Sequence, residues 1–292
     1  MEVTRSAYYG YLLKQKSKID VDVKVVVEMK ALHKISNKSY GSRRMAKALL
    51  CQGYEIGRFK VRRLMRQNGI FCKQRRRYTT TTQSRHELVV AENILNREFN
   101  VTKPNEKWVS DITYVWTNEG WLYVASVLDL FSRRVIGWAA SDSMKTDLIE
   151  KAFNMALGRR RPAAGFLHHS DRGVQYASES YQTLLRKSGA VVSMSRKGNC
   201  WDNSVMERFF GSLKSERTDG KMYKSRAAAR DDVANYIECF YNSHRLHSTL
   251  NYMSPIAYEN SYAIRKFPVP SFQMESRVKS AMPAAEAKLY SC

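Results

Sequence analysis

The chain has 292 residues, of which 43% are hydrophobic, enough for a catalytic domain of ordinary size and one smaller domain. Its net charge of +22 exceeds what folding requires and indicates a polyanionic partner, with nucleic acid as the first candidate. No apolar run approaches the roughly 20 residues of a membrane span, and no secretory signal is present, so we expect a cytoplasmic protein without membrane contact. The five cysteines form no CxxC pair, which argues against disulfides and structural zinc.

The positive charge is concentrated at the N-terminal end of the chain. Residues 1–86 contain 21 Lys or Arg and 5 Asp or Glu residues, which give +16 of the total charge. Apolar spacing predicts three helices here, and glycines at positions 53 and 69 are expected to end the second and the third. These helices are expected at residues 24–35, from residue 40 to the Gly53 stop, and at 59–67.

The third predicted helix is basic, and such a trio is typical of a helix-turn-helix-like unit that lays its last helix along DNA. The alternative is that the basic side chains only solvate an exposed face, but their number exceeds what solubility needs. We therefore predict a DNA-binding region at residues 1–75 and a basic polar linker at 76–103. The side chains expected to contact DNA are Arg43, Arg44, Lys60, Arg62, Arg63, Arg66, Arg75, Arg76 and Arg77.

From Lys107 onward the pattern changes to that of strands. Three strands joined by short turns are typical of an antiparallel meander, and helices then alternate with two further strands. The strands are expected at 108–116, 121–130, 135–140, 165–169 and 190–193, and the helices at 146–157, 178–187, from 202–204 onward, and at 225–245. This order predicts an α/β fold over residues 104–262, a ribonuclease H-like mixed five-stranded sheet with helices on both faces, preceded by the small all-α domain. Residues 263–292 are expected to form a flexible tail.

Three acidic residues stand out within this region. Asp111 lies in the first predicted strand, Asp171 follows the fourth, and Glu207 lies in the first turn of a predicted helix. In the predicted sheet the first and fourth strands are neighbours, so the two aspartates should meet and the helix should add the glutamate. The alternative for Glu207 is a capping box with Ser204, in which the glutamate only satisfies the start of the helix.

The spacing of these acids, with 59 residues between the first two and 35 between the last two, resembles the D,D-35-E triad of retroviral-type integrases and bacterial insertion-sequence transposases. The motifs VLDLFSRRVIGW, HSDRGVQY, SMSRKGNCWDNSVMERFFGSLKSE and YNSHRLHSTLNYMSP are similar to those of the IS3-type transposase family, in its longer reading-frame product. The resemblance extends from about Tyr8 to Tyr258. It implies an enzyme that cuts and joins the ends of an insertion sequence by phosphodiester hydrolysis and transesterification, with Asp111, Asp171 and Glu207 as catalytic and metal-binding acids.

Three carboxylates without Cys or paired His ligands suit Mg²⁺ or Mn²⁺ and not Zn²⁺. Two such ions would clamp an in-line displacement at phosphorus, and we expect the site to fill when phosphate arrives. Lys214 lies seven residues after Glu207 and so projects from nearly the same helix face. The resemblance implies that it contacts a phosphate or a base near the tip of the element; a solvent-facing lysine is the alternative.

The resemblance also implies the partners. These are double-stranded DNA, as terminal inverted repeats and as target, further copies of the chain on that DNA, and the upstream-frame product of the same element. Two other functions compete: a catalytically silent sequence-specific DNA-binding protein and a plain ribonuclease H-like nuclease. For other notable residues we expect structural roles: a salt bridge or sheet edge for Asp129, a helix cap for Asp202, a basic partner for Glu216, and core packing for Trp108, His168, His169 and Trp201.

Overall fold

The computed structural model describes residues 4–73 and 90–266, which fall in two compact units. Arg75, Arg76 and Arg77 lie outside the described residues, as do parts of the expected linker and tail. Within the described part of the chain, no helix has the length and apolar character needed to span a membrane.

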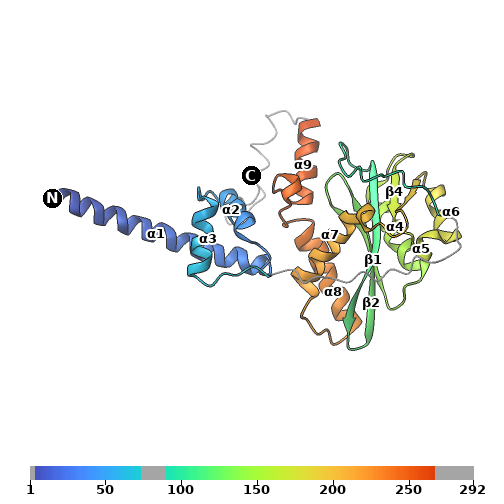
Figure 1. Cartoon of the computed structure of the whole chain (residues 1–292), viewed down its shortest axis with the longest axis horizontal. Helices are drawn as coiled ribbons and strands as arrows, with labels where there is room; N and C mark the ends of the chain where they lie inside the picture. Colours follow the sequence, from blue (N-terminus) through green and yellow to red (C-terminus); the bar gives the residue numbers. More distant parts are fainter. Residues whose placement is uncertain (1–3, 74–89, 267–292) are drawn as a thin grey trace, which may run out of the picture. The chain divides into compact units, whose positions relative to one another are not determined.

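The first unit consists of three helices, α1 (Arg5–Ile35), α2 (Ser42–Cys51) and α3 (Arg58–Gln67) (Figure 1). Each helix contributes apolar side chains to a small core: Val25 and Met29 from α1, Met45, Ala48 and Leu49 from α2, and Val61, Leu64 and Met65 from α3. Gly53 and Gly69 follow the second and third helices with φ of 85° and 64°, as a left-handed helix end requires. The three predicted helices and their two glycine stops are therefore confirmed.

The first helix is much longer than its apolar spacing predicted. It begins at Arg5, where the Thr4 side chain accepts a hydrogen bond from the Ala7 amide at 3.4 Å. Its early residues Tyr8, Tyr9 and Leu13 are exposed. Only the later part packs in the core, and only that part carries the periodic apolar signal on which the prediction depended.

The second unit is built on a five-stranded sheet. Its strands are β1 (Lys107–Thr117), β2 (Gly120–Asp129), β3 (Val135–Ser141), β4 (Leu167–Ser170) and β5 (Val191–Met194). They lie in the order β3-β2-β1-β4-β5. The first three pair antiparallel, whereas β4 pairs parallel with β1 and with β5. This is the predicted ribonuclease H-like mixed sheet.

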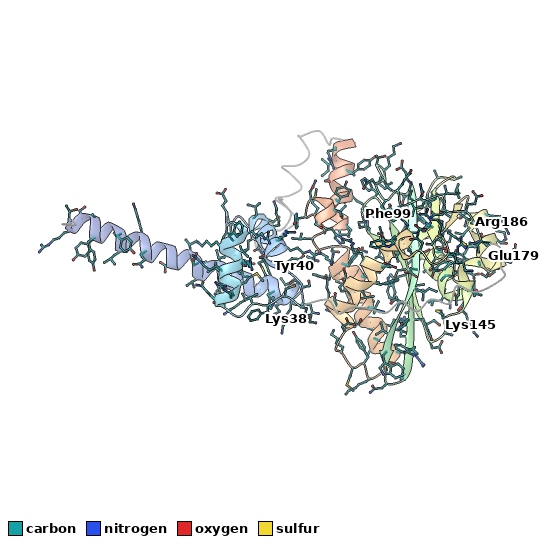
Figure 2. All side chains as sticks on the ribbon, in the orientation of Figure 1. Lys38, Tyr40, Phe99, Lys145, Glu179 and Arg186 are labelled. Carbon is teal, nitrogen blue, oxygen red and sulfur yellow. The ribbon has the colours of Figure 1, made fainter. Side chains whose placement is uncertain are left out.

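Helices cover both faces of the sheet (Figure 1). One layer contains α4 (Thr146–Arg160), α5 (Val174–Ala177) and α6 (Glu179–Lys187), and the other contains α7 (Ser204–Leu213) and α8 (Arg226–Asn235), with α9 (Pro255–Lys266) closing the unit. Trp108 on β1 packs with Phe153 of α4, whereas the neighbouring Val109 belongs to the core that holds Phe209 of α7. Polar pairs lie outside this core, such as the 2.6 Å ion pair between Glu179 and Arg186 along α6 (Figure 2).

Two helices that the sequence predicted as continuous contain π-helical turns, η2 (Lys214–Thr218) and η3 (Tyr236–Tyr241). Beside them lies a buried ion pair, in which the Arg245 Nη2 donates to Glu216 Oε1 at 2.7 Å. The Tyr236 hydroxyl donates to the other carboxylate oxygen at 2.8 Å. The basic partner expected for Glu216 is thus Arg245, and this pair joins the end of α7 to the segment after α8. Short 3₁₀ helices, η1 (Cys200–Asn203) and η4 (Ser248–Leu250), complete the unit.

The described part of the expected linker, from residue 90, packs on the second unit. Leu95 is fully buried in its core, and the Ile94 and Leu95 amides donate to Ser193 Oγ at 3.0 and 3.1 Å. At the other end, α9 continues to Lys266, four residues beyond the expected core boundary at 262.

The contact between β3 and α4 supplies a prediction for stability. A Cβ at Gly137 on β3 would lie 2.2 Å from the Ala152 carbonyl oxygen and 2.7 Å from the Ala156 amide nitrogen. Because both atoms belong to the backbone of α4, Gly137→Ala should lower the free energy of unfolding by about 3 kcal/mol. This loss should appear in urea-unfolding curves of the whole chain.

Gly158 is the matched control, since it lies exposed on the same helix with open space around its Cβ position. Gly158→Ala should raise the free energy of unfolding by about 0.5–1 kcal/mol, because alanine has the higher helix propensity. A loss in this control, or no loss in Gly137→Ala, would contradict the packing described for α4.

Candidate active site

The parallel pairing of β1 with β4 brings two of the three acids to one place. Lys107, Trp108 and Val109 pair with residues exactly 60 positions later, at 167, 168 and 169. Asp111 and Asp171 keep this offset and each follow the last registered pair by two residues. Asp111, within β1, therefore lies level with Asp171, which follows the carboxyl end of β4.

The surroundings of Asp111 show that the other two acids influence its charge. Its carboxylate accepts a hydrogen bond from the Ile112 amide at 2.8 Å. Burial raises the pKa of Asp111 well above its usual value, and the charge of Asp171 and then that of Glu207 raise it further, whereas Lys214 lowers it. The three acids and this lysine thus share one electrostatic neighbourhood.

Asp171 is held by the turn that follows β4. The Gly173 amide donates to Asp171 Oδ1 at 2.9 Å. A Cβ at Gly173 would lie only 3.0 Å from the same oxygen, so a larger residue would crowd the carboxylate. The glycine of HSDRG therefore permits the close approach of backbone and acid that fixes the orientation of Asp171.

Glu207 lies in the first turn of α7, and its side chain is exposed. The helix begins at Ser204 with Asn203 as its N-cap residue, so the alternative capping box with Ser204 as the cap is not formed. Asn203 Nδ2 donates to the Ser110 carbonyl at 3.3 Å, which ties the start of α7 to the residue before Asp111. Desolvation raises the pKa of Glu207.

The loop before α7 is anchored by Asp202. This buried carboxylate accepts hydrogen bonds from the Arg196 amide and side chain at 2.8–3.0 Å, from Arg97 Nε at 2.8 Å and from Asn93 Nδ2 at 2.8 Å. Arg196 holds the pKa of Asp202 well below its usual range. The expected helix cap is wrong, because the side chain is an ion-pair centre and makes no capping bond. Trp201 is 68% exposed, so its predicted core role is also wrong.

Two histidines behind the acids are buried and neutral. His168 Nε2 contacts Ser110 Oγ at 2.8 Å and the Tyr181 hydroxyl at 3.2 Å. His169 lies between Ser193 Oγ and Ser195 Oγ, at 2.8 and 3.1 Å. Burial lowers the pKa of His168 to about 3 and that of His169 to about 4, so near neutral pH neither carries a charge. Their predicted role in core packing is confirmed, as is that of the fully buried Trp108.

Sequence reasoning missed Tyr176, which lies on α5 beside the acids. Its hydroxyl is buried near Ser110 but makes no hydrogen bond of acceptable geometry within the described residues. Burial raises its pKa well above the usual value, and the charges of Asp111 and Asp171 raise it further. A tyrosine hydroxyl buried near two carboxylates places a hydrogen-bond donor in their neighbourhood. The tyrosine at the end of the motif HSDRGVQY was the sequence feature that could have indicated this residue.

The acids do not form a closed metal cage. Across residues 4–73 and 90–266, no group of three or more His, Cys, Asp or Glu side chains could hold a metal ion as it stands. Their donor chemistry nevertheless fits a hard divalent cation, since all three supply carboxylate oxygens. The mutual repulsion recorded in the raised pKa of Asp111 is also what a bound cation would relieve.

Asp129, the remaining buried acid of the sheet, has a structural role. Its carboxylate accepts hydrogen bonds from the Asn105 and Phe131 amides at 2.9 Å each, and Arg160 Nη2 lies 4.0 Å away. Burial raises its pKa to about 6. The expected salt bridge is therefore present but long, and backbone amides supply the main contacts.

The predicted DNA-contacting residues of the first unit differ in their surroundings. Lys60 Nζ lies 2.5 Å from Asp22 Oδ1, and Arg63 lies 3.8 Å from the same carboxylate. Arg44 lies over the Tyr40 ring at 5.9 Å. The exposed members of the described set are Arg43, Arg62, Arg63 and Arg66.

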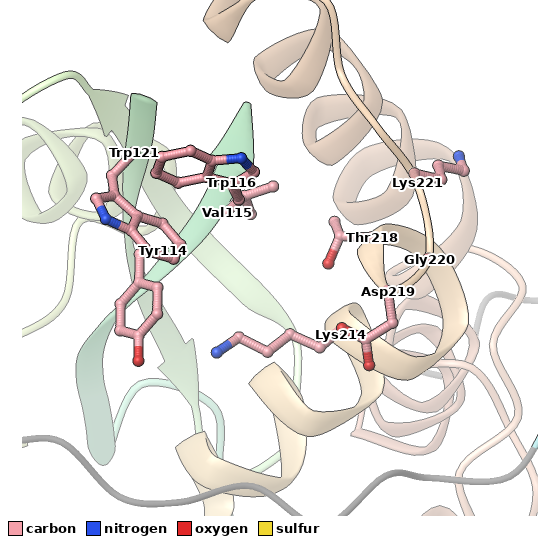
Figure 3. Close-up of a pocket in the computed structure, with 9 residues that line it drawn as sticks. All are labelled: Tyr114, Val115, Trp116, Trp121, Lys214, Thr218, Asp219, Gly220 and Lys221. Atoms are coloured by element: carbon pink, nitrogen blue, oxygen red, sulfur yellow. The ribbon is translucent and has the colours of Figure 1, made fainter. Parts of the chain in front are cut away.

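Lys214 points into a cleft next to the acids. Its Nζ lies 4.6 Å from the centroid of the Tyr114 ring, so a purely solvent-facing role does not describe it. Figure 3 shows Lys214 directed at one wall of the cleft, which Tyr114, Trp116 and Trp121 form. Sequence reasoning missed these aromatic residues, although alternation along a strand places Tyr114 and Trp116 on one face.

Comparison with known proteins gives matches to family models and to solved structures. Residues 101–200 and 207–262 match two family models described as "Integrase core domain", and residues 20–78 match one described as "HTH-like domain". Among solved structures, a chain of the simian T-cell lymphotropic virus intasome in complex with PP2A regulatory subunit B56 gamma has a TM-score of 0.46 at 15% identity, covering 83% of this chain and 77% of its own. The catalytic core domain of BIV integrase has a TM-score of 0.41 at 16% identity, with coverage of 56% and 99%.

Relatives with closer sequences determine the family. The "Insertion element IS600 uncharacterized 31 kDa protein" of Shigella sonnei is 41% identical over 89% of this chain and 96% of its own length. "Transposase InsF for insertion sequence IS3A" of Escherichia coli (strain K12) is 43% identical over 77% of this chain and 78% of its own length. With this identity over most of both lengths, the chain belongs to the IS3 family of insertion-sequence transposases.

Proposed function

We propose that the chain cuts and joins DNA at the ends of an insertion sequence, with Asp111, Asp171 and Glu207 as its catalytic acids. One observation carries these assignments. The parallel pairing of β1 with β4 brings Asp111, within β1, level with Asp171 at the carboxyl end of β4, and the charges of Asp171 and Glu207 raise the pKa of Asp111. Three carboxylates gathered at one end of a sheet suit a phosphodiester reaction that depends on divalent cations.

The three acids would hold Mg²⁺ or Mn²⁺, two ions in a complete site. Bound there, the ions would activate the attacking oxygen and stabilise the leaving 3′ oxygen. The rest of the chemistry belongs to the protein: Lys214 binds a phosphate beside the acids, and the Asn203 contact to β1 keeps Glu207 in place. The buried histidines behind the acids take no proton from the nucleophile, since burial lowers the pKa of both far below neutral pH.

Within this proposal the DNA-binding region covers residues 1–75, the linker 76–103, the catalytic core 104–262 and the tail 263–292. The basic side chains of the first unit hold the terminal inverted repeats, and α3 lies along the DNA. Joining two ends of an element requires at least two copies of the chain, and the upstream-frame product of the same element is a further partner. A protein that acts on DNA in this way works in the cytoplasm of a bacterium.

The acids are tested by removing one carboxylate charge at a time. Asp111→Asn, Asp171→Asn and Glu207→Gln should each lower strand joining by at least about 1,000-fold, because the site loses a cation ligand, while DNA binding is kept. The measurement is joining of labelled element ends in Mg²⁺, with binding followed by mobility shift. Asp142→Asn, at an exposed acid after β3, is the control and should join normally.

An acid whose variant still joins ends at the normal rate would not belong to the site. If the unmodified chain binds the ends but neither cuts nor joins them in Mg²⁺, it is a catalytically silent DNA-binding protein. Cutting without joining would indicate a plain nuclease.

The raised pKa of Asp111 predicts how stability depends on pH. The folded chain binds this proton more tightly than the unfolded chain, so ionising Asp111 costs stability as pH rises from about 4 through the raised pKa. Asp111→Asn should therefore raise the melting temperature at pH 8, and this gain should vanish near pH 4. Thermal unfolding across this pH range measures both values; a variant that is less stable at pH 8 would contradict the repulsion.

Cation binding is tested in the same thermal assay at pH 8. Mg²⁺ should raise the melting temperature of the unmodified chain, because a ligand that binds only the folded state stabilises it. The rise should be smaller in Asp111→Asn, which lacks one of the ligands. An equal rise in both proteins would place the bound ion elsewhere.

The basic face of α3 is tested through salt dependence. Arg62→Ala and Arg66→Ala should each reduce the slope of log affinity against log salt by about 0.9, as expected for one lost phosphate contact. Lys60→Ala should change it less, because this ammonium is already paired with Asp22. Unchanged slopes in both arginine variants would show that α3 does not lie along the DNA.

A further inference from the structure

The tip of the β1–β2 hairpin carries an exposed aromatic cluster, formed by Tyr114, Trp116 and Trp121. Trp121 contacts the other two rings edge to face, at centroid distances of 4.9 Å to Tyr114 and 4.7 Å to Trp116. Trp116 is 55% exposed and Trp121 42% exposed. Cross-strand pairing explains why the rings touch, but it leaves two large indole surfaces in water.

This aromatic cluster forms one wall of a cleft, and η2 with the turn after it forms the other (Figure 3). The second wall contains Lys214, Thr218, Asp219, Gly220 and Lys221. The cleft has a volume of about 270 Å³, just below the roughly 300–1,000 Å³ of pockets for drug-sized ligands. A single planar group matches it better than a larger ligand.

The two walls are joined by fixed contacts, so the cleft is preformed. The Asn118 amide at the hairpin turn donates to the Tyr223 carbonyl at 2.9 Å. Arg226 Nε donates to the Trp121 carbonyl at 3.0 Å, and the Arg226 amide donates to Glu119 Oε2 at 2.8 Å. A site held in this way loses little entropy when a ligand enters.

The cleft lies next to the acids. Tyr114 follows Asp111 by three residues on β1, roughly 10 Å along the strand, and alternation points the two side chains to opposite faces of the sheet. Lys214 connects both places, since its charge lowers the pKa of Asp111 while its ammonium lies over the Tyr114 ring. At 3.4 Å per stacked base, roughly 10 Å corresponds to about three nucleotides from a phosphate at the acids.

We propose that this cleft takes one unpaired nucleobase of the DNA, within about three nucleotides of the reacting phosphate. The base stacks on one of the two indoles and meets the other at its edge, since the Trp116 and Trp121 planes are inclined by 74°, and Lys214 binds the adjoining phosphate. The proposal rests on the proposed function, because it assigns a substrate contact to that same site. A flat aromatic surface beside a cation, in a chain of net charge +22, matches nucleic acid better than an apolar protein partner.

The test compares two variants of Trp116 on two DNAs. Trp116→Leu keeps apolar bulk at the hairpin but removes the flat ring, whereas Trp116→Phe keeps a ring. One DNA is a fully paired end, and the other has three unpaired nucleotides, with 2-aminopurine at the third. Binding of the full-length chain is measured without divalent ions, so that no reaction occurs, and unfolding curves confirm that both variants fold.

The unmodified chain should quench the unpaired 2-aminopurine and bind this DNA more tightly than the paired end. Trp116→Leu should lose the quenching and about 10-fold in affinity for the unpaired end, with less than about 2-fold change on the paired end. Trp116→Phe should keep most of both. Trp121→Leu should repeat the loss, which excludes an effect peculiar to one position.

Three results would overturn the proposal: an equal loss on both DNAs, no loss on either, or a change in self-association of the chain instead of DNA binding. The last would mean that a second copy covers the cleft. The same measurements distinguish a failure of this proposal from a failure of the proposed function. A chain that joins ends but binds paired and unpaired ends equally lacks only the base site, whereas a chain that binds neither DNA lacks the proposed function.

Discussion

The candidate active site depends on the parallel pairing of β1 with β4, which brings two carboxylates level with each other despite their repulsion. The contact between β1 and β4 is short, yet its constant offset of 60 residues determines that Asp111 and Asp171 emerge at one level. Everything around it supports that placement: the Gly173 amide orients one acid, and the Asn203 amide fixes the helix that carries the third. Concentrating negative charge at this place lowers the stability of the fold, as is common at sites that bind cations.

The buried polar groups behind the acids help to hold the strands of the site in fixed positions. The two histidines are kept neutral by burial and are surrounded by hydroxyl groups on the neighbouring strands. Hydrogen bonds of this kind fix the relative positions of β1, β4 and β5 without adding charge near the acids. The Tyr176 hydroxyl is buried near Ser110 in the same neighbourhood, and the charges of Asp111 and Asp171 add to the burial that raises its pKa.

The sequence was sufficient to predict the sheet, the order of its helices and the meeting of β1 with β4, because strand alternation and the spacing of acids are local signals. The sequence was insufficient to predict features that depend on tertiary contacts. The early turns of α1 carry no core-facing apolar pattern, and the π turns at η2 and η3 accompany a buried ion pair between distant residues. Trp201 is exposed because its neighbour Asp202 takes the buried position, a choice that composition does not reveal. The three acids as a catalytic set remain a prediction.

The ion pairs of Asp202 have a mechanical consequence. Arg97 and Asn93 belong to the segment by which the chain enters the second unit, and both hold Asp202, which immediately precedes the N-cap of α7. Two side-chain links therefore connect the segment at residues 93–97 to the turn that bears Glu207. A displacement of this segment would therefore change the position of Glu207.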